Sequence, residues 1–246
     1  MKKINPRQNE IECLNSIRDS FINLAGIEKV FDNTDFLTMK QILETAYQNE
    51  KHSEFPDFFF DGGVIEHFEV TASDTIGKGS QYRYEDARHR KENRIHLEQL
   101  DKEYSDNPYQ SGTISTEVVE DIYNCFSYES FVSSFKRNVE QHLESLMDSE
   151  YKNKIVVFLI EQDAARLGVY SGEKFDRFYK LSEDKNLLQY MKKTMIDVDY
   201  VIYTCADAYE IIDLSKIDSV LKHAKCNLDV RCEKQRNISI KFWLDS

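Results

Sequence analysis

The sequence has little of what staples or interrupts a fold: five cysteines, three prolines and eight glycines among 246 residues. The cysteines are odd in number, scattered and never spaced as CxxC, which argues against a disulfide framework and against a zinc knuckle. No internal repeat or low-complexity segment is visible. Because a chain of this length buries enough surface to form a core without such staples, we predict a single α/β domain over residues 1–246.

Long apolar runs are also missing. No segment approaches the roughly 18 apolar residues of a membrane span, and the first residues lack the apolar part of a signal peptide. We therefore expect a soluble, cytoplasmic protein without a membrane partner. A homo-oligomer and a complex with a partner protein both stay open.

Basic residues are scarce relative to acidic ones, with 32 against 44 and a formal net charge of -12. This charge opposes broad attraction to a phosphate backbone, so any contact with nucleic acid must be local. The densest basic cluster, residues 83–94, is interleaved with acidic residues. It favours the interpretation of a solvated helix face.

Hydrophobic periodicity predicts an α/β fold, with a mixed β-sheet flanked by helices. Apolar residues at steps of three and four predict helices over residues 8–24 and about 34–46, and a long one through Phe131 and Leu146. The unbroken apolar runs at 155–160 and 200–205 are typical of strands covered on both faces, and a helix between them implies a parallel crossover. Further predictions are a helix-rich region at 174–195, a strand at 210–213, a helix to about 224, and a strand in the C-terminal ISIKFWLD.

Two segments have a more specific pattern. Residues 58–60 and 64–71 flank Asp61-Gly62-Gly63, which is a strong turn signal, and they predict an antiparallel hairpin. Residues 74–114 lose apolar periodicity, and we expect loops around a polar helix at 82–104. A segment of this kind is often a functional element, or simply an insertion.

The hairpin carries the charged residues of greatest interest. Because side chains alternate along a strand, His67, Glu69 and Thr71 share one face, and Phe68 and Val70 mark the other as the core side. Asp57 stands at the entry of the neighbouring strand, and we expect it to converge with Glu69. Two carboxylates held together repel unless a cation joins them, and an oxygen-ligand site suits Mg²⁺ or Mn²⁺.

Pro56-Asp57, eleven further residues and then Glu69-Val70-Thr71 resemble the motif of the restriction-endonuclease-like PD-(D/E)XK superfamily. The resemblance implies a nuclease core over about 36–161, followed by a C-terminal α/β extension over about 174–246. It implies a Mg²⁺- or Mn²⁺-dependent endonuclease acting on DNA, in defence against foreign DNA. Asp57 and Glu69 would be metal ligands, with Glu44 on the preceding helix as a further acidic ligand.

The chain departs from the motif at one position. Where the family has a lysine, this sequence has Thr71, which cannot supply positive charge to a developing hydroxide or phosphate. Lys78 is the nearest substitute cation, and His67 is a candidate base or phosphate contact. The family core also has three strands before its crossover helix, of which this sequence predicts two.

Structural roles remain open for each of these residues. Asp57 also fits a residue that satisfies backbone amides near Pro56, and Asp61 fits a turn former. An inward Glu69 is costly unless it is paired or metal-bound, but the residue could also face solvent. Two further hypotheses stand beside the nuclease: a catalytically inactive nuclease-fold protein that serves as a binding or assembly subunit, and an unrelated α/β protein with solvated hairpin charges.

Overall fold

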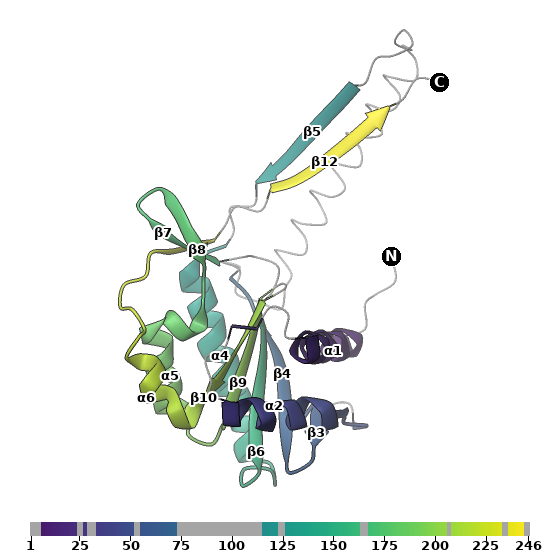
Figure 1. Cartoon of the computed structure of the whole chain (residues 1–246), viewed down its shortest axis with the longest axis vertical. Coiled ribbons are helices and arrows are strands. Elements are labelled where there is room, and N and C mark those ends of the chain that lie inside the picture. The colour runs from purple at the N-terminus through teal and green to yellow at the C-terminus, as the bar shows by residue number, and fades with distance from the viewer. Residues whose placement is uncertain are drawn as a thin grey trace.

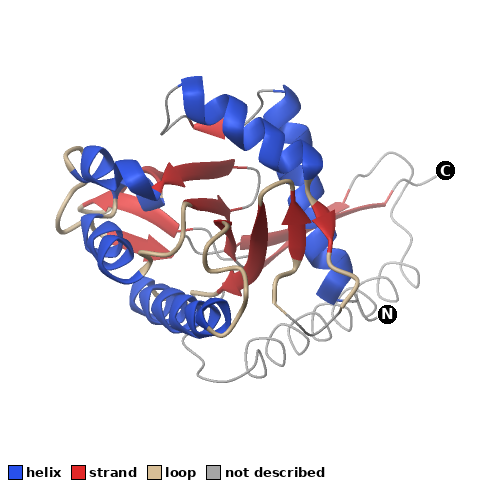
Figure 2. Ribbon diagram, turned by 90° about the horizontal axis from the view of Figure 1, so that it is seen from below, coloured by secondary structure: helices blue, strands red, loops and turns tan. Residues whose placement is uncertain are grey.

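A seven-stranded mixed sheet with helices on both faces organises the chain (Figures 1 and 2). The structure is a computed structural model, and it describes residues 6–23, 27–28, 33–51, 55–72, 115–122, 126–162, 167–205, 208–232 and 236–243. The strand order is β1-β10-β9-β6-β4-β3-β2. The strands are β1 (Ile27–Glu28), β2 (Tyr47–Gln48), β3 (Phe58–Phe60), β4 (Gly63–Val70), β6 (Ile155–Gln162), β9 (Tyr200–Cys205) and β10 (Ala208–Asp213). The predicted α/β class with a mixed, helix-flanked sheet is confirmed.

Each face of the sheet has its own helices and its own apolar cluster. Helices α1 (Pro6–Asn23) and α2 (Asn33–Thr45) supply buried residues to one cluster. Helices α4 (Tyr128–Met147) and α5 (Lys185–Thr194), with the short α6 (Ile217–Leu221), supply the other. Two short 3₁₀ turns, η1 (Leu181–Glu183) and η2 (Leu214–Lys216), precede α5 and α6. The three long helices predicted from periodicity are therefore confirmed.

The pairing of the central strands follows the prediction. Strands β3 and β4 form an antiparallel hairpin around the Asp61-Gly62 turn, while β4 with β6, and β6 with β9, run parallel. One strand between α2 and β3 escaped the prediction. It is β2, only two residues long, and it pairs with β3 at the sheet edge. A pattern of alternation cannot be recognised in two residues.

The region predicted to be helix-rich begins differently. Residues 174–178 form a strand, β8 (Lys174–Phe178), which pairs with β7 (Leu167–Ser171) across a turn at Gly172, whose φ is +64°. Phe175 and Phe178 are three residues apart, a helical spacing, yet both lie on the strand and are exposed. A third strand, β11 (Val230–Cys232), completes this small sheet.

The predicted C-terminal strand is confirmed, but its partner was not foreseen. Strand β12 (Arg236–Trp243) pairs antiparallel with β5 (Ser115–Ile122) in a separate two-stranded sheet, which projects from the main body in Figure 1. Residues 73–114 lie outside the described residues. The predicted polar helix at 82–104 and Lys78 belong to that segment.

Strand β4 is covered on both faces rather than on one. Ile65 packs in the cluster of α1 and α2, whereas Val64, Phe68 and Val70 pack in the cluster of α4 and α5. The alternation predicted from the sequence is confirmed. The expectation of a single core face is wrong, because helices lie against both sides of this central strand, and Glu69 is its one exposed residue.

A substitution in the hairpin tests how closely β4 packs against β6. An added Cβ at Gly63 would lie 2.1 Å from the backbone oxygen of Ile155, which cannot move without disturbing the strand pairing. We expect Gly63→Ala to lower the free energy of unfolding by about 3 kcal/mol in denaturant titrations. Gly62→Ala is the matched control. There φ is +97° but no atom lies within 4 Å, so only the backbone cost of about 1 kcal/mol applies. Equal losses in both variants would contradict the close packing.

Candidate metal centre

The polar side chains of β4 divide between the two faces of the sheet. His67 lies on the face covered by α1, where its ring contacts Glu161 of β6 and has Cys13 of α1 nearby. Glu66 turns toward α4, where its partner is His142. Both β4 residues are buried, with exposed fractions of 8% for His67 and 6% for Glu66. Each therefore needs a polar partner, and each has one.

The group on the α1 side combines three kinds of ligand atom. Nε2 of His67 lies 3.0 Å from Oε2 of Glu161, within hydrogen-bond distance. The thiol of Cys13 hydrogen-bonds Glu161 as well. The sulfur, the imidazole nitrogen and the carboxylate oxygen all lie within 4.8 Å of one another. Cys13 and His67 are buried, and Glu161 is half-buried at the edge of the cluster.

The thiol in this group is held in its protonated form. Burial raises the pKa of Cys13 far above its ordinary value, and the negative charges of Glu161 and then Glu69 raise it further. Without a cation, the cluster is a neutral thiol beside carboxylates and an imidazole.

Glu69 and Glu161 occupy equivalent places on neighbouring strands. They are Cα partners in the parallel pairing of β4 and β6, and Thr204 continues the row on β9. Partners in adjacent strands lie about 4.8 Å apart and point to the same face. All three residues lie near the carboxyl ends of their strands, where ligands bind in open α/β sheets.

The group on the α4 side consists of Asp57, Glu66 and His142. Glu66 accepts from the backbone N–H of Asp57 at 3.2 Å and contacts Nδ1 of His142 at 2.6 Å. The His142 ring also stacks on Phe68, with centroids 4.4 Å apart. Asp57 in turn accepts from the backbone N–H of His67 at 2.8 Å. Burial first, and the charge of Glu66 second, raise the pKa of Asp57 to about 6.

The structure does not bring Asp57 and Glu69 to one cation, as the sequence had suggested. The charges that act on Asp57 are those of Glu66, His67 and His142, whereas the carboxylate of Glu69 acts on Cys13 beside α1. The reason is the register of the hairpin. The two-residue turn pairs Phe58 with Ile65, and the same count sets Asp57 opposite Glu66, three residues short of Glu69. The carboxylate of Asp57 does accept from a backbone amide, but that amide belongs to His67 on β4 and not to the residues near Pro56.

The other predicted site residues lie at different distances from this centre. Glu44 is exposed on α2 and forms an ion pair with Lys40, so the structure does not add it to either group. Thr71 lies just beyond β4, and its backbone N–H donates to Oγ of Ser134 in α4. Lys78 lies outside the described residues, and its role stays a prediction. Asp61 is exposed in the hairpin turn, as a turn former should be.

Sequence reasoning missed Cys13, Glu161 and His142. Cys13 lies within the apolar stripe of a helix, and such a cysteine gives no sign of its partners. His142 lies on the long amphipathic helix between core positions. Glu161 offered the better signal, because it ends an apolar run of six residues and so stands where a buried strand reaches solvent.

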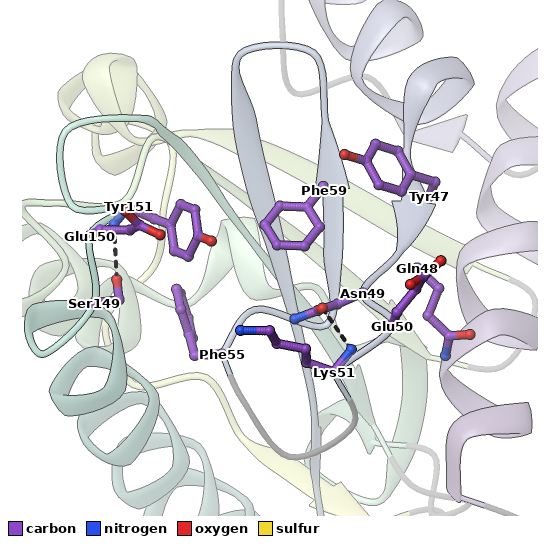
Figure 3. A pocket seen from close by; sticks show the side chains of 10 residues that line it. All are labelled: Tyr47, Gln48, Asn49, Glu50, Lys51, Phe55, Phe59, Ser149, Glu150 and Tyr151. Carbon is purple, nitrogen blue, oxygen red and sulfur yellow. Dashed lines mark hydrogen bonds between the residues drawn. The ribbon is translucent and has the colours of Figure 1, made fainter.

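A pocket of about 620 Å³ lies elsewhere, beside β2, β3 and the turn that precedes β6. Figure 3 shows the rings of Phe55, Phe59 and Tyr151 turned toward one another, and the Tyr151 centroid is 6.4 Å from that of Phe55 and 5.6 Å from that of Phe59. The residues that line it are Tyr47, Gln48, Asn49, Glu50, Lys51, Phe55, Phe59, Ser149, Glu150 and Tyr151. None of them belongs to the two polar groups of β4, so the pocket and the candidate metal centre are separate.

Comparisons with protein-family models, curated proteins and solved structures gave no match. No helix of the described residues is long and apolar enough to cross a membrane.

The raised pKa of Asp57 predicts a pH-dependent effect of Asp57→Asn. A carboxyl whose pKa rises from 3.8 to about 6 on folding contributes stability that is lost as the pH rises through the folded value. Asparagine can still accept from the His67 N–H but carries no charge. We expect Asp57→Asn to gain stability relative to wild type between about pH 4.5 and pH 7.5, as measured by denaturant unfolding.

The partner residue supplies the control for this measurement. In a Glu66→Gln background, much of the repulsion on Asp57 is absent, so the pH-dependent gain from Asp57→Asn should shrink. A difference in stability between Asp57→Asn and wild type that is the same at pH 4.5 and pH 7.5 would contradict the raised pKa of Asp57.

Proposed function

We propose that this chain is a metal-dependent nuclease that hydrolyses DNA phosphodiester bonds, with its divalent ion held by Glu69 and Glu161. The observation that carries the proposal is the register of β4 and β6, which makes these two acidic residues direct neighbours near the carboxyl ends of parallel strands. Glu69 is exposed and Glu161 is half-buried, so the pair is open to a substrate at the carboxyl ends of β4 and β6.

The donor atoms fit a divalent ion. Two carboxylates from adjacent strands provide the oxygen ligands that Mg²⁺ and Mn²⁺ prefer. When bound, such an ion polarises a phosphate and lowers the pKa of coordinated water. His67 orients Glu161 through its 3.0 Å contact, as ring nitrogens beside ligating carboxylates commonly do. The chain's own contribution is therefore to hold the carboxylates of Glu69 and Glu161 on neighbouring strands and to fix Glu161 through its contact with His67.

The order of elements supports the resemblance to the PD-(D/E)XK superfamily. Helix α2 is followed by strands β2, β3 and β4 of the main sheet, by β5 of the separate two-stranded sheet, by α4, and then by β6 parallel to β4. Between α2 and α4 the main sheet has three strands, β2, β3 and β4, which is the number that the family core has before its crossover helix. Relative to the motif, one ligand changes: Glu161 on β6 takes the part expected of Asp57.

The proposed cation would also offset the negative charge of the site toward DNA. The chain has a net charge of -12, and Glu69 and Glu161 would repel a phosphate that approached them directly. A divalent ion between them reverses the local sign. Binding of DNA, and not only its hydrolysis, should therefore depend on the ion.

A second candidate function is a nuclease-fold protein without catalysis, acting as a binding or assembly subunit. Thr71 at the lysine position of the motif favours it, because threonine brings no positive charge to the reaction. The position is also tied to α4 through its backbone bond to Ser134.

Cation-dependent cleavage tests the proposal. Purified wild type is incubated with plasmid and with single-stranded DNA in Mg²⁺, Mn²⁺ or a chelator, and products are separated on gels. We expect cleavage with either ion, and a loss of about 100-fold or more in Glu69→Gln and in Glu161→Gln, since each removes a charged ligand but little volume. Glu44→Gln is the matched control, an exposed glutamate on α2 outside the site, and should cleave like wild type.

Three outcomes separate the alternatives. Loss of activity in Asp57→Asn with full activity in Glu161→Gln would restore the ligand set expected from the motif and reject the one proposed here. Equal activity in all variants would trace cleavage to a contaminant. No cleavage by wild type under any condition would favour the non-catalytic candidate.

A further inference from the structure

Cys13, His67 and Glu161 differ in chemistry from a magnesium site. The group offers one thiol sulfur, one imidazole nitrogen and one carboxylate oxygen, contributed by α1, β4 and β6. Magnesium prefers an all-oxygen environment, whereas sulfur and nitrogen donors select borderline metals such as zinc. Three protein ligands and an open fourth position are the ligand count of catalytic zinc sites.

The spacing of the three atoms is close to that of a loaded site. Ligand atoms of a tetrahedral zinc ion lie about 3.3 to 3.8 Å apart, given metal–ligand distances of about 2.0 to 2.3 Å. The three atoms here lie within 4.8 Å of one another, and the His67 nitrogen and the Glu161 oxygen are already at 3.0 Å. Small side-chain rotations would therefore bring all three to one ion.

The surroundings of the group also fit a cation. The thiol of Cys13 is buried, and the carboxylate of Glu161 brings a negatively charged ligand to the group. The imidazole is buried in the centre of the sheet, with its orientation fixed by Glu161.

We propose that Cys13, His67 and Glu161 form a transition-metal site that binds Zn²⁺, with α1 supplying the thiolate from above the sheet. The site shares Glu161 with the proposed nuclease centre. Zn²⁺ bound here therefore competes with a Mg²⁺ or Mn²⁺ ion that takes both oxygens of this carboxylate. Zinc binding itself does not depend on DNA cleavage.

Cobalt substitution tests the proposal on the full chain. The protein is stripped with a chelator, desalted and titrated with Co²⁺, then with Zn²⁺ in competition, while absorption is recorded. Wild type should bind one equivalent of Co²⁺, with the near-ultraviolet charge-transfer band of a thiolate ligand and the intense visible bands of a tetrahedral ion, and Zn²⁺ should displace it. Absence of these bands in wild type would overturn the proposal.

Variants assign the ligands. Cys13→Ser should abolish the charge-transfer band, and His67→Gln should weaken zinc binding at least about 100-fold, since even residues that only orient ligands contribute 10- to 100-fold. Two controls match these changes. Cys226→Ser changes an exposed cysteine, and His142→Gln changes a histidine of α4, which packs on the other face of the sheet. A band that survives Cys13→Ser, or disappears in Cys226→Ser, would reject the assignment. Circular dichroism establishes that each variant is folded.

The two proposals fail separately. Tetrahedral cobalt binding without DNA cleavage would leave the zinc site and reject the nuclease. Cleavage that depends on Mg²⁺ and on Glu69, in a protein that shows no cobalt bands, would reject the zinc site and leave the nuclease.

Discussion

Strand β4 lies inside the sheet, between β6 and β3, with helices against both faces, and the two polar groups described above follow from that position. A buried charge or imidazole is costly unless it is paired. Glu66 and His67 are consecutive residues, so they point to opposite faces, and each meets a partner there: His142 on α4 for Glu66, and Glu161 on β6 for His67. Glu69 avoids the cost in another way, because it stands near the end of the strand and is exposed.

The two polar groups include consecutive residues of β4, Glu66 and His67, but lie on opposite faces of the sheet, with the backbone of β4 between them. Asp57 is the one link, because its carboxylate lies with Glu66 yet accepts a hydrogen bond from the backbone of His67. Backbone pairing between β3 and β4 begins at Phe58, so Asp57 lies just before β3. There its side chain, and not a strand backbone, accepts from the N–H of His67. Asp57 therefore fixes the strand at the residue whose ring orients Glu161. A substitution at Asp57 can therefore shift His67, and with it Glu161, although Asp57 itself contacts neither Glu161 nor Cys13 in the contacts described.

The sequence predicted well wherever the physics is local. Alternation assigned the faces of β4, helical periodicity located α1, α2 and α4, and unbroken apolar runs located β6 and β9. The convergence of Asp57 with Glu69 failed, although the means to correct it were present: a two-residue turn at Asp61-Gly62 fixes the register, and counting back sets Asp57 opposite Glu66. Cys13 and Glu161 are a different case. They lie 148 positions apart in the chain, and only the packing of α1 across β6 brings them together, which no local pattern encodes.

Glu161 is the residue at which both proposed ion sites meet, and its neighbours offer it two kinds of partner. Toward solvent it stands beside Glu69, and two carboxylates favour a hard ion such as Mg²⁺. Toward the interior it stands beside His67 and Cys13, and these donors favour a softer ion. Thiolate and imidazole bind zinc far more strongly than carboxylates bind magnesium, but zinc must displace the proton of a thiol whose pKa burial has raised. The buried position of Cys13 thus weakens zinc binding at neutral pH and narrows the difference between the two ions. Under the two proposals, the choice of metal at Glu161 therefore depends on how deeply α1 buries the sulfur of Cys13.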